Sequence, residues 1–335
     1  MSETETPASS PALRAAVTLL PGGWIGPEVA AHAQAVVAAL GVDIDWHVFP
    51  DEHDISAAAI ADARLTGVVL KGRFDSHKQP GKLPPTVRIR KELGTYATVR
   101  VARALPGSPA RFPKMDLVVI RETSEDIYAG LEHEITDGVY EAVKVTTRAG
   151  TERIARFAFA YARKHGRKKV TIVHKSNIMK KSDGLFLKTC QAVAAEFPDI
   201  AVDEVIVDAL CMKLVRNPSQ FDVLLAGNLF GDIVSDLCSG LAGGIIASPS
   251  HSVGDGVQIF EMPHGKAAEL VGRDLANPVP FLRTTRLMLD GIGQTAAAER
   301  LRVAIAAVTE AGVKTADMGG SARSSEVVAA IIAAL

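Results

Sequence analysis

Two aspartates stand four residues apart in the segment NLFGDIVSD, which spans residues 228–236. The segment follows the apolar run FDVLLAG and is predicted to begin a helix, which places Asp232 and Asp236 on one helical face. Two like charges at this spacing cost roughly 0.2–0.5 kcal/mol on an exposed helix. A divalent cation would offset that cost, and oxygen ligands favour Mg²⁺ or Mn²⁺ over zinc. The alternative is a solvated helix start, where carboxylates interact favourably with the helix dipole.

Basic side chains near the predicted strand DLVVI are candidates for binding an acidic substrate, because an arginine fork holds a carboxylate with two hydrogen bonds. Lys175 ends another predicted strand, VTIVH, and a lysine near a metal and arginines can act as a base. The alternative for each of these residues is a solvated surface position. The arginines crowded into this region are Arg88, Arg90, Arg100, Arg103, Arg111 and Arg121.

The elements that must position these residues alternate between short apolar runs and longer helical patterns. Examples are the runs AAVTLL, DLVVIRE and KKVTIVHK and the helical segment TERIARFAFAYARKHG. This alternation predicts an α/β fold with a largely parallel sheet. The glycine fingerprint GxGxxG and the phosphate-binding motif GxxxxGK[ST] are both absent, so a nucleotide would have to be held in another way.

Composition excludes several classes of protein. The chain has 335 residues, 47% of them hydrophobic, which is enough for two domains. A net charge of -1 argues against nucleic-acid binding, and no apolar run is long enough to span a membrane. Three cysteines without CxxC spacing suit a reducing compartment. Residues 1–14 read as a disordered tail without signal-peptide features, so we expect a cytoplasmic protein.

From about Ala15 to Ala330 the chain resembles the isocitrate/isopropylmalate dehydrogenase family of metal-dependent β-decarboxylating dehydrogenases, and it is most similar to the NAD-linked isocitrate dehydrogenase branch. The resemblance rests on LPGGWIGPEV, RKELGTYATVR, IRETSEDIYAGLEH, VHKSNIMKKSDGLF, NLFGDIVSDLCSGLAGG and HGKAAELVGRDLANP. It implies a large discontinuous domain, 15–99 with 250–335, and a smaller central domain, 100–249, that forms a homodimer with shared active sites.

The resemblance also implies roles for the candidate residues. Arg90, Arg100 and Arg121 match the arginines that grip the substrate carboxylates. Tyr128 matches a tyrosine that works in proton transfer to the enol, and Lys175 matches a lysine that assists removal of the 2-hydroxyl proton in the neighbouring subunit's site. The implied metal ligands are Asp232 and Asp236 with Asp208, the last again shared across the dimer.

The cofactor is expected to lie on loops such as 264–278, which explains the missing glycine fingerprint. Glu269 and Leu270 follow His264 by five and six positions, where NAD users of the family carry an acidic and an aliphatic residue. A carboxylate accepts hydrogen bonds from a free ribose hydroxyl and repels a 2′-phosphate, so the resemblance implies NAD. The expected cofactor-binding residues are Ser76, His264, Gly265, Glu269, Leu270 and Asn277.

Several positions depart from the family pattern. Trp24 stands in a turn that usually carries an aspartate, Lys266 stands in the usual His-Gly-Thr/Ser-Ala-Pro segment, and Asp75-Ser76-His77 replaces a threonine-rich turn. Isocitrate users carry a serine and an asparagine where this chain has Pro84 and Thr86, so Thr86, Arg88, His77 or Lys82 is left to meet the rest of the substrate. The alternative is that these departures are sequence drift in a loop and do not reflect a different substrate.

Three functions therefore remain open at the level of sequence. The first is NAD- and Mg²⁺- or Mn²⁺-dependent oxidative decarboxylation of isocitrate or a closely related 2-hydroxy-3-carboxy acid, a small hydroxy di- or tricarboxylate. The second keeps the reaction and changes the substrate to homoisocitrate, 3-isopropylmalate or a phosphonate analogue. The third is a non-catalytic regulatory paralogue, which the retention of all eight matching residues disfavours.

Overall fold

The computed structural model describes residues 14–51, 53–75, 83–262 and 265–335. Four residues singled out above, Ser76, His77, Lys82 and His264, lie outside the described residues, as does the predicted tail apart from Arg14. None of the helices in the described ranges is long and apolar enough to cross a membrane.

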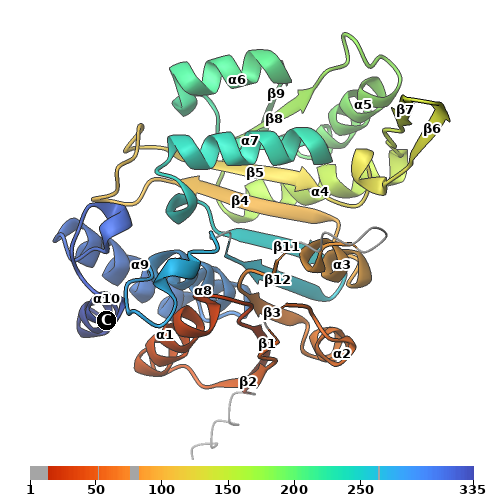
Figure 1. The fold of residues 1–335 in the computed structure, drawn as a ribbon. Coiled ribbons are helices and arrows are strands. Elements are labelled where there is room, and N and C mark those ends of the chain that lie inside the picture. The colour runs from red at the N-terminus through yellow and green to blue at the C-terminus, as the bar shows by residue number, and fades with distance from the viewer. Residues whose placement is uncertain (1–13, 52, 76–82, 263–264) are drawn as a thin grey trace, which may run out of the picture.

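A ten-stranded sheet runs through the whole molecule in the order β2-β1-β3-β12-β11-β4-β5-β10-β8-β9 (Figure 1). Among the described strands the outer pairs are parallel, whereas β12–β11, β11–β4 and β4–β5 in the middle are antiparallel. The predicted α/β class with a mostly parallel sheet is confirmed. The strands are β1 (Ala15–Leu20), β2 (Ile44–Val48), β3 (Val68–Lys71), β4 (Ala97–Arg103), β5 (Asp116–Glu122), β8 (Lys169–His174), β9 (Ala201–Ile206), β10 (Val223–Ala226), β11 (Ser250–Gly254) and β12 (Val257–Glu261), and β6 (Glu132–Thr136) and β7 (Val139–Ala142) form a separate hairpin.

Helices cover both faces of the sheet, as expected for parallel strands joined by crossovers (Figure 1). Alternate residues of β5 face opposite sides: Leu117 and Val119 pack with α7, whereas Val118 and Ile120 pack with α4. The helices are α1 (Gly26–Ala39), α2 (Ala57–Thr66), α3 (Pro85–Glu92), α4 (Arg148–Lys164), α5 (Ser182–Ala194), α6 (Val207–Arg216), α7 (Asn228–Leu241), α8 (Val279–Gly291), α9 (Thr295–Glu310) and α10 (Ser324–Ala333).

Residues from both ends of the chain share one hydrophobic core. Val17 of β1 and Val29 of α1 belong to the same buried cluster as Phe281 of α8 and Leu301 of α9. Two further clusters lie on either face of β4, β5, β10 and β8 and are built almost entirely from residues 97–253. The exact division into domains, 15–99 with 250–335 and 100–249, stays a prediction.

Candidate active site

Arg121 and Asn228 meet because β5 and β10 are parallel and end at the same edge of the sheet. Arg121 lies at the end of β5, and Asn228 follows β10 and begins α7. The Asn228 side-chain oxygen accepts hydrogen bonds from Arg121 Nε at 2.9 Å and Nη2 at 2.6 Å, and the arginine is only 7% exposed. This edge, outside the carboxyl ends of the strands, is where open α/β sheets bind ligands.

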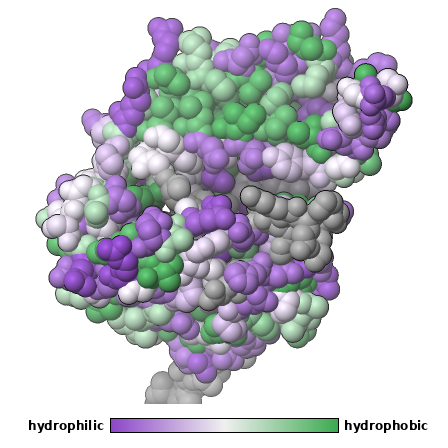
Figure 2. Space-filling model, in the orientation of Figure 1, coloured by the Kyte–Doolittle hydropathy of each residue, from purple (hydrophilic) through white to green (hydrophobic). Residues whose placement is uncertain are grey.

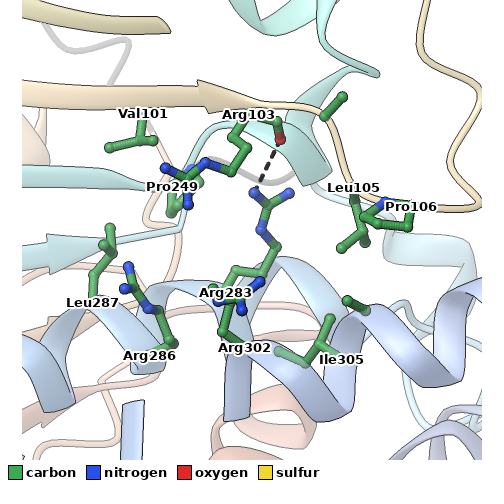
Figure 3. A pocket seen from close by; sticks show the side chains of 12 residues that line it. Val101, Arg103, Leu105, Pro106, Pro249, Arg283, Arg286, Leu287, Arg302 and Ile305 are labelled. Carbon is green, nitrogen blue, oxygen red and sulfur yellow. Dashed lines mark hydrogen bonds between the residues drawn. The ribbon is translucent and has the colours of Figure 1, made fainter. Parts of the chain in front are cut away.

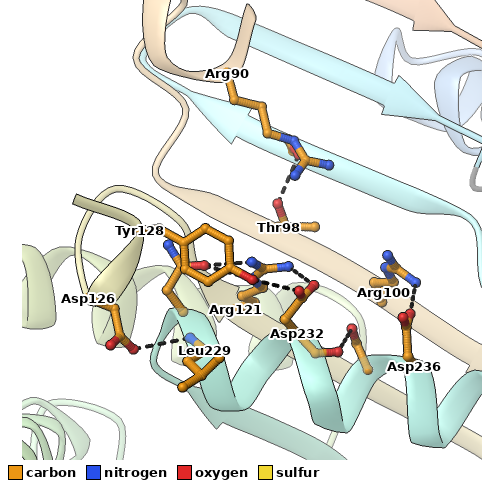
Figure 4. Close-up of polar contacts among 12 residues, drawn as sticks. Arg90, Thr98, Arg100, Arg121, Asp126, Tyr128, Leu229, Asp232 and Asp236 are labelled. Atoms are coloured by element: carbon orange, nitrogen blue, oxygen red, sulfur yellow. Dashed lines mark hydrogen bonds and ion pairs between the residues drawn. The ribbon is translucent and has the colours of Figure 1, made fainter. Parts of the chain in front are cut away.

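Asp232 completes the surroundings of Arg121. Its carboxylate accepts hydrogen bonds from Arg121 Nη1 and from the Tyr128 hydroxyl, the latter at 2.7 Å, and the Tyr128 ring lies 5.0 Å from the guanidinium carbon (Figure 4). Burial lowers the pKa of Arg121, and the Asp232 charge opposes that shift. Burial, reinforced by Asp232, raises the pKa of Tyr128 above its ordinary value, and the phenol is protonated at neutral pH in either case.

The close approach of α7 to Arg121 requires a glycine at position 231. A Cβ atom added to Gly231 would lie 2.7 Å from Cγ and 2.8 Å from Cβ of Arg121. The Asp126 carboxylate also fixes the start of this helix, because it accepts the Leu229 backbone N–H at 3.1 Å. The glycine and the aspartate thus place the first turn of α7 against the end of β5.

Asp236 lies one turn further along α7 and faces a different arginine. Arg100 of β4 donates from Nη1 to Asp236 Oδ1 at 2.8 Å, and the aspartate side chain is 72% exposed (Figure 4). Both aspartates lie on the helical face that the sequence predicts, and each is neutralised by its own arginine. The like-charge cost is therefore offset by arginines within this chain.

Arg90 belongs to a buried charge network centred on Glu261. Arg90 Nη2 and Lys71 Nζ each lie 2.7 Å from a Glu261 oxygen, and Lys71 is fully buried. Burial alone would raise the pKa of Glu261, but the charges of Lys71 and Arg90 outweigh burial and hold that pKa at about 2. Burial also lowers the pKa of Lys71, against the attraction of Glu261.

A cavity of about 440 Å³ opens beside these groups. Basic side chains supply much of its wall, while Tyr128 and Asn228 lie at its edge. Arg153 joins this wall, held by a 3.1 Å hydrogen bond to the Ser124 hydroxyl and by the face of the Tyr96 ring. The cationic lining side chains are Arg90, Lys91, Arg121 and Arg153. A wall of this composition suits a small molecule with several carboxylates.

Lys175 and Asp208 form a separate pair. Lys175 Nζ lies 2.6 Å from Asp208 Oδ1, and this ion pair lowers the pKa of Asp208. The carboxylates of Asp208, Asp232 and Asp236 do not gather into one group within the part of the chain that is described. The three ligand atoms found within 4.8 Å of one another there come from Glu28, His32 and Asp274. A site that needs Asp208 with the other two aspartates would require a second subunit.

Two of the expected substrate-binding residues face elsewhere. The Arg88 guanidinium contacts Asp54 at 2.9 Å and the Ile55 carbonyl oxygen, and it is not part of the cavity lining. The Thr86 hydroxyl lies 3.5 Å from Glu261. Pro84 caps the start of α3, where it supplies no side-chain hydrogen bond. The roles predicted for Arg88 and Thr86 stay predictions.

The expected cofactor loop follows β12, which runs antiparallel to β5, so it leaves the sheet at the edge opposite to the carboxyl ends of β5 and β10. Glu269 is exposed, Leu270 packs against the core, and Gly265 is exposed. Asn277 accepts the Val279 backbone N–H at 2.9 Å and donates to Asp317 at 2.9 Å, so its side chain is held just before the start of α8. The role of exposed Glu269 in binding a cofactor stays a prediction.

Comparison with known proteins agrees with this geometry. The family model described as isocitrate/isopropylmalate dehydrogenase matches residues 16–331. The chain belongs to the isocitrate/isopropylmalate dehydrogenase family. The predicted resemblance and the prediction of a decarboxylating dehydrogenase acting on hydroxy acids are thereby confirmed.

Individual relatives cover almost the whole chain. Mitochondrial NAD isocitrate dehydrogenase catalytic subunit 5 of Arabidopsis thaliana is 42% identical over 94% of this chain and 87% of its own length. Chloroplastic 3-isopropylmalate dehydrogenase of Solanum tuberosum is 41% identical over 86% of this chain and 83% of its own. The crystal structure of isocitrate dehydrogenase from Methylococcus capsulatus has a TM-score of 0.89 and 37% identity, covering 95% and 98% of the two chains. Other relatives are named regulatory subunits.

Three departures from the family pattern lie together in the structure. Lys266 Nζ is 2.9 Å from Asp75 Oδ1 and 5.0 Å from the centre of the Trp24 ring. Trp24 and Asp75 each stand four residues after the end of a strand, β1 and β3, and Lys266 stands five after β12. Since β1, β3 and β12 are neighbouring parallel strands, their following loops meet at one edge of the sheet. Each departure alone resembles drift, but together they form one contact.

Sequence reasoning missed Glu261, Lys71, Asn228 and Arg153. Lys71 and Glu261 are directly paired residues of β3 and β12, which lie 190 positions apart in the chain. The sequence did carry one signal: each of these two apolar strands ends in a charged residue, and the two charges have opposite signs. The sheet order was needed to bring them together.

We predict that Glu261→Gln lowers the free energy of unfolding by about 3–5 kcal/mol at pH 7, because it leaves buried Lys71 and Arg90 without a carboxylate. Urea denaturation measures the change. The matched control is Glu310→Gln at the exposed end of α9, which should alter stability by less than about 0.5 kcal/mol.

The buried carboxylate of Glu261 also predicts how the stability of the protein depends on pH. The folded-state pKa of Glu261 lies below its unfolded value, so its contribution is complete above about pH 5 and is lost as the pH falls toward 2. The loss of wild-type stability across this window should therefore be steeper than that of Glu261→Gln. If the free energies of unfolding of the two proteins fell equally with pH, the lowered pKa given to Glu261 would be contradicted.

Proposed function

We propose that the protein catalyses the NAD-dependent, metal-assisted oxidative decarboxylation of isocitrate or a closely related 2-hydroxy-3-carboxy acid. The observation that carries the proposal is the Tyr128 hydroxyl bonded to Asp232 beside buried Arg121, at the edge of a cavity lined by basic side chains. This arrangement combines a proton donor, a potential metal ligand and a carboxylate-binding group.

The arginines bind and orient the substrate in this proposal. Arg121 is already held by Asn228, so it loses little conformational freedom when a carboxylate arrives. Arg90 lies on the same cavity with its charge shared with Glu261, and Arg100 lies beside Asp236. Substrate carboxylates would replace the aspartates as partners of Arg100 and Arg121, which frees those aspartates for a cation.

Asp232 and Asp236, with Asp208 of a second subunit, would hold Mg²⁺ or Mn²⁺. The donor set consists only of carboxylate oxygens, which suits a hard cation, and the exposure of Asp236 leaves it open to one. When bound, the metal would polarise the 2-hydroxyl and the adjacent carboxylate and stabilise developing negative charge. The exchange of partners, from arginine to cation, makes metal binding and substrate binding mutually favourable.

Protons would move at Tyr128 and Lys175. The Tyr128 phenol is protonated at neutral pH and is proposed to deliver its proton to the enol carbon after CO₂ leaves. Lys175 is proposed to assist removal of the 2-hydroxyl proton in the site of the neighbouring subunit. Its Nζ is held 2.6 Å from Asp208, so the proposed base and the third ligand would enter that site together.

NAD would accept the hydride, and exposed Glu269 is the chain's means of preferring it over NADP. A carboxylate accepts hydrogen bonds from a ribose 2′-hydroxyl and repels a phosphate in its place. Gly265, Leu270 and Asn277 lie on the same segment and are proposed to line the adenosine side of the cofactor. Ser76 and His264 remain predictions outside the described residues.

A homodimer is proposed to form over α6 and α7. Figure 2 shows apolar side chains gathered on this part of the surface. Met212 is 50% exposed, Val215 42% and Ile233 54%, which is unusual for large hydrophobic residues on neighbouring helices. Packing of a second copy there would cover them and bring Lys175 and Asp208 toward the partner site. Relatives named as catalytic and regulatory subunits make a heteromeric complex the alternative, and a cytoplasmic location stays a prediction.

A different substrate is the second candidate, and the start of α3 favours it. Pro84 offers no side-chain hydrogen bond, Thr86 faces Glu261, and Arg88 is engaged by Asp54. None of the three meets the cavity as a polar group for a third substrate carboxylate. Homoisocitrate, 3-isopropylmalate or a phosphonate analogue would then replace isocitrate while the chemistry stays the same.

A substrate panel tests the proposal. With Mn²⁺ and NAD, formation of NADH at 340 nm is expected for isocitrate or one close analogue among homoisocitrate, 3-isopropylmalate, malate, tartrate and phosphonates. Asp232→Asn should lower kcat/KM at least about 100-fold, because it removes a proposed metal ligand and a partner of Arg121 and Tyr128. The matched control, Asp255→Asn on an exposed turn, should keep wild-type activity. If folded protein that binds Mn²⁺ formed no NADH with any of these acids, the result would favour a non-catalytic regulatory paralogue.

Cofactor choice is tested by Glu269→Lys. We expect the variant to lose at least about tenfold in kcat/KM for NAD relative to NADP, since a cation attracts a 2′-phosphate and no longer accepts from the ribose hydroxyls. Initial rates with the two cofactors at fixed substrate measure the ratio. Comparable wild-type turnover with NAD and NADP would contradict the role given to Glu269.

The link between Lys266 and Asp75 is tested by Lys266→Met, which keeps most of the side chain and removes its charge. The ion pair is about half exposed, so its loss should raise KM for NAD only about two- to fivefold, with kcat little changed. Lys188→Met, exposed on α5, is the control. An unchanged KM would show that the contact does not position the cofactor segment.

A further inference from the structure

A second cluster of arginines lies on the opposite face of β4 from Arg100 and Asp236. Side chains alternate along β4, so Arg100 faces Asp236 while Val101 and Arg103 face a cavity on the other side. This cavity measures about 80 Å³ and lies between the end of β4, the residues that follow it, and helices α8 and α9 (Figure 3). Among the described residues, none lines both this cavity and the cavity beside Tyr128.

Four guanidinium groups surround this back-face cavity, and two of them have no carboxylate partner among the described residues. Arg103 pairs with Asp116 at 2.8 Å and Arg302 with Glu299 at 2.6 Å. Arg283 instead donates to two backbone carbonyl oxygens, those of Ile246 at 2.5 Å and Arg103 at 3.1 Å. For Arg286 the described residues offer no hydrogen-bond partner, and its Nε is buried.

Crowding of these like charges around the cavity is electrostatically unfavourable. Burial, and then the charges of Arg103 and Arg286, lowers the pKa of Arg283 to about 10. Asp290 and Glu299 partly balance Arg286 from α8 and α9, but only through space. An anion among the guanidinium groups would relieve this repulsion and supply the missing hydrogen-bond acceptors.

We propose that the back-face cavity binds a phosphate group, either free or at the end of a small phosphate ester. Two guanidinium groups without carboxylate partners match a dianion, and arginine forks fit phosphate oxygens. One water occupies about 30 Å³ of the liquid, so the cavity is large enough for a single tetrahedral oxyanion. Apolar side chains form the rest of the wall and would contact the body of an ester: Val101, Leu105, Pro106, Pro249, Leu287 and Ile305.

The site would join parts of the chain that are far apart in sequence. Arg103 ends β4, whereas Arg283 and Arg286 lie on α8 and Arg302 on α9. A bound phosphate would therefore stabilise the packing of these helices against the middle of the sheet and raise the unfolding temperature.

Isothermal titration with inorganic phosphate tests the proposal on the full chain. Phosphate should also bind the arginines of the candidate active site, so two variants separate the two events. Arg286→Gln should weaken the back-face event by about tenfold or more and keep the other. Arg100→Gln should weaken the active-site event and keep the back-face one. The control is Arg216→Gln, which makes the same change of charge at the exposed end of α6.

Loss of all phosphate binding in Arg100→Gln, with full binding in Arg286→Gln, would overturn the proposal. Arg286→Lys guards against a folding defect, because it retains the charge and loses only the fork, and weaker binding by this folded variant supports the site. Glycerol 3-phosphate separates the two sources of phosphate. Tighter binding than inorganic phosphate, lost in Arg286→Gln, assigns the site to an ester, and equal or weaker binding assigns it to free phosphate.

Discussion

The buried guanidinium group of Arg121 is the constraint around which the candidate site is organised. A fixed charge that is only 7% exposed must find partners, and it does so through Asn228, Asp232 and the face of Tyr128. Tyr128 comes from the segment after β5, whereas Asn228 and Asp232 both lie on α7, and Gly231 lets that helix approach Arg121 closely enough. The parallel pairing of β5 and β10 makes this possible by bringing both strand ends to one edge.

Pairing of opposite charges then decides what the two aspartates can do. With Arg100 and Arg121 as partners, Asp232 and Asp236 lie on one helical face without a cation. In the proposed function, a substrate carboxylate would take the arginines as partners while a metal took the aspartates. Such an exchange would couple the two binding events through charge.

Local patterns in the sequence predicted the parts of the site that depend on a single strand or helix. The apolar run of β5 and the spacing of Asp232 and Asp236 were sufficient to place these residues at a strand end and on one helical face. The Lys71–Glu261 pair was not predictable in this way, because it depends on β3 and β12 being neighbours across 190 residues. The contact of Trp24, Asp75 and Lys266 was missed for the same reason, although each was noticed as a departure.

The period of two along a strand explains how one element serves two arginine-rich sites. Arg100 and Arg103 lie three residues apart in β4, an odd number, so they must point to opposite faces of the sheet. Arg100 therefore meets Asp236 of α7, while Arg103 meets the arginines of α8 and α9. The two cavities also lie at different ends of β4: one is lined by Gly94 and Thr95, which precede the strand, and the other by Val101 and Arg103 at its end.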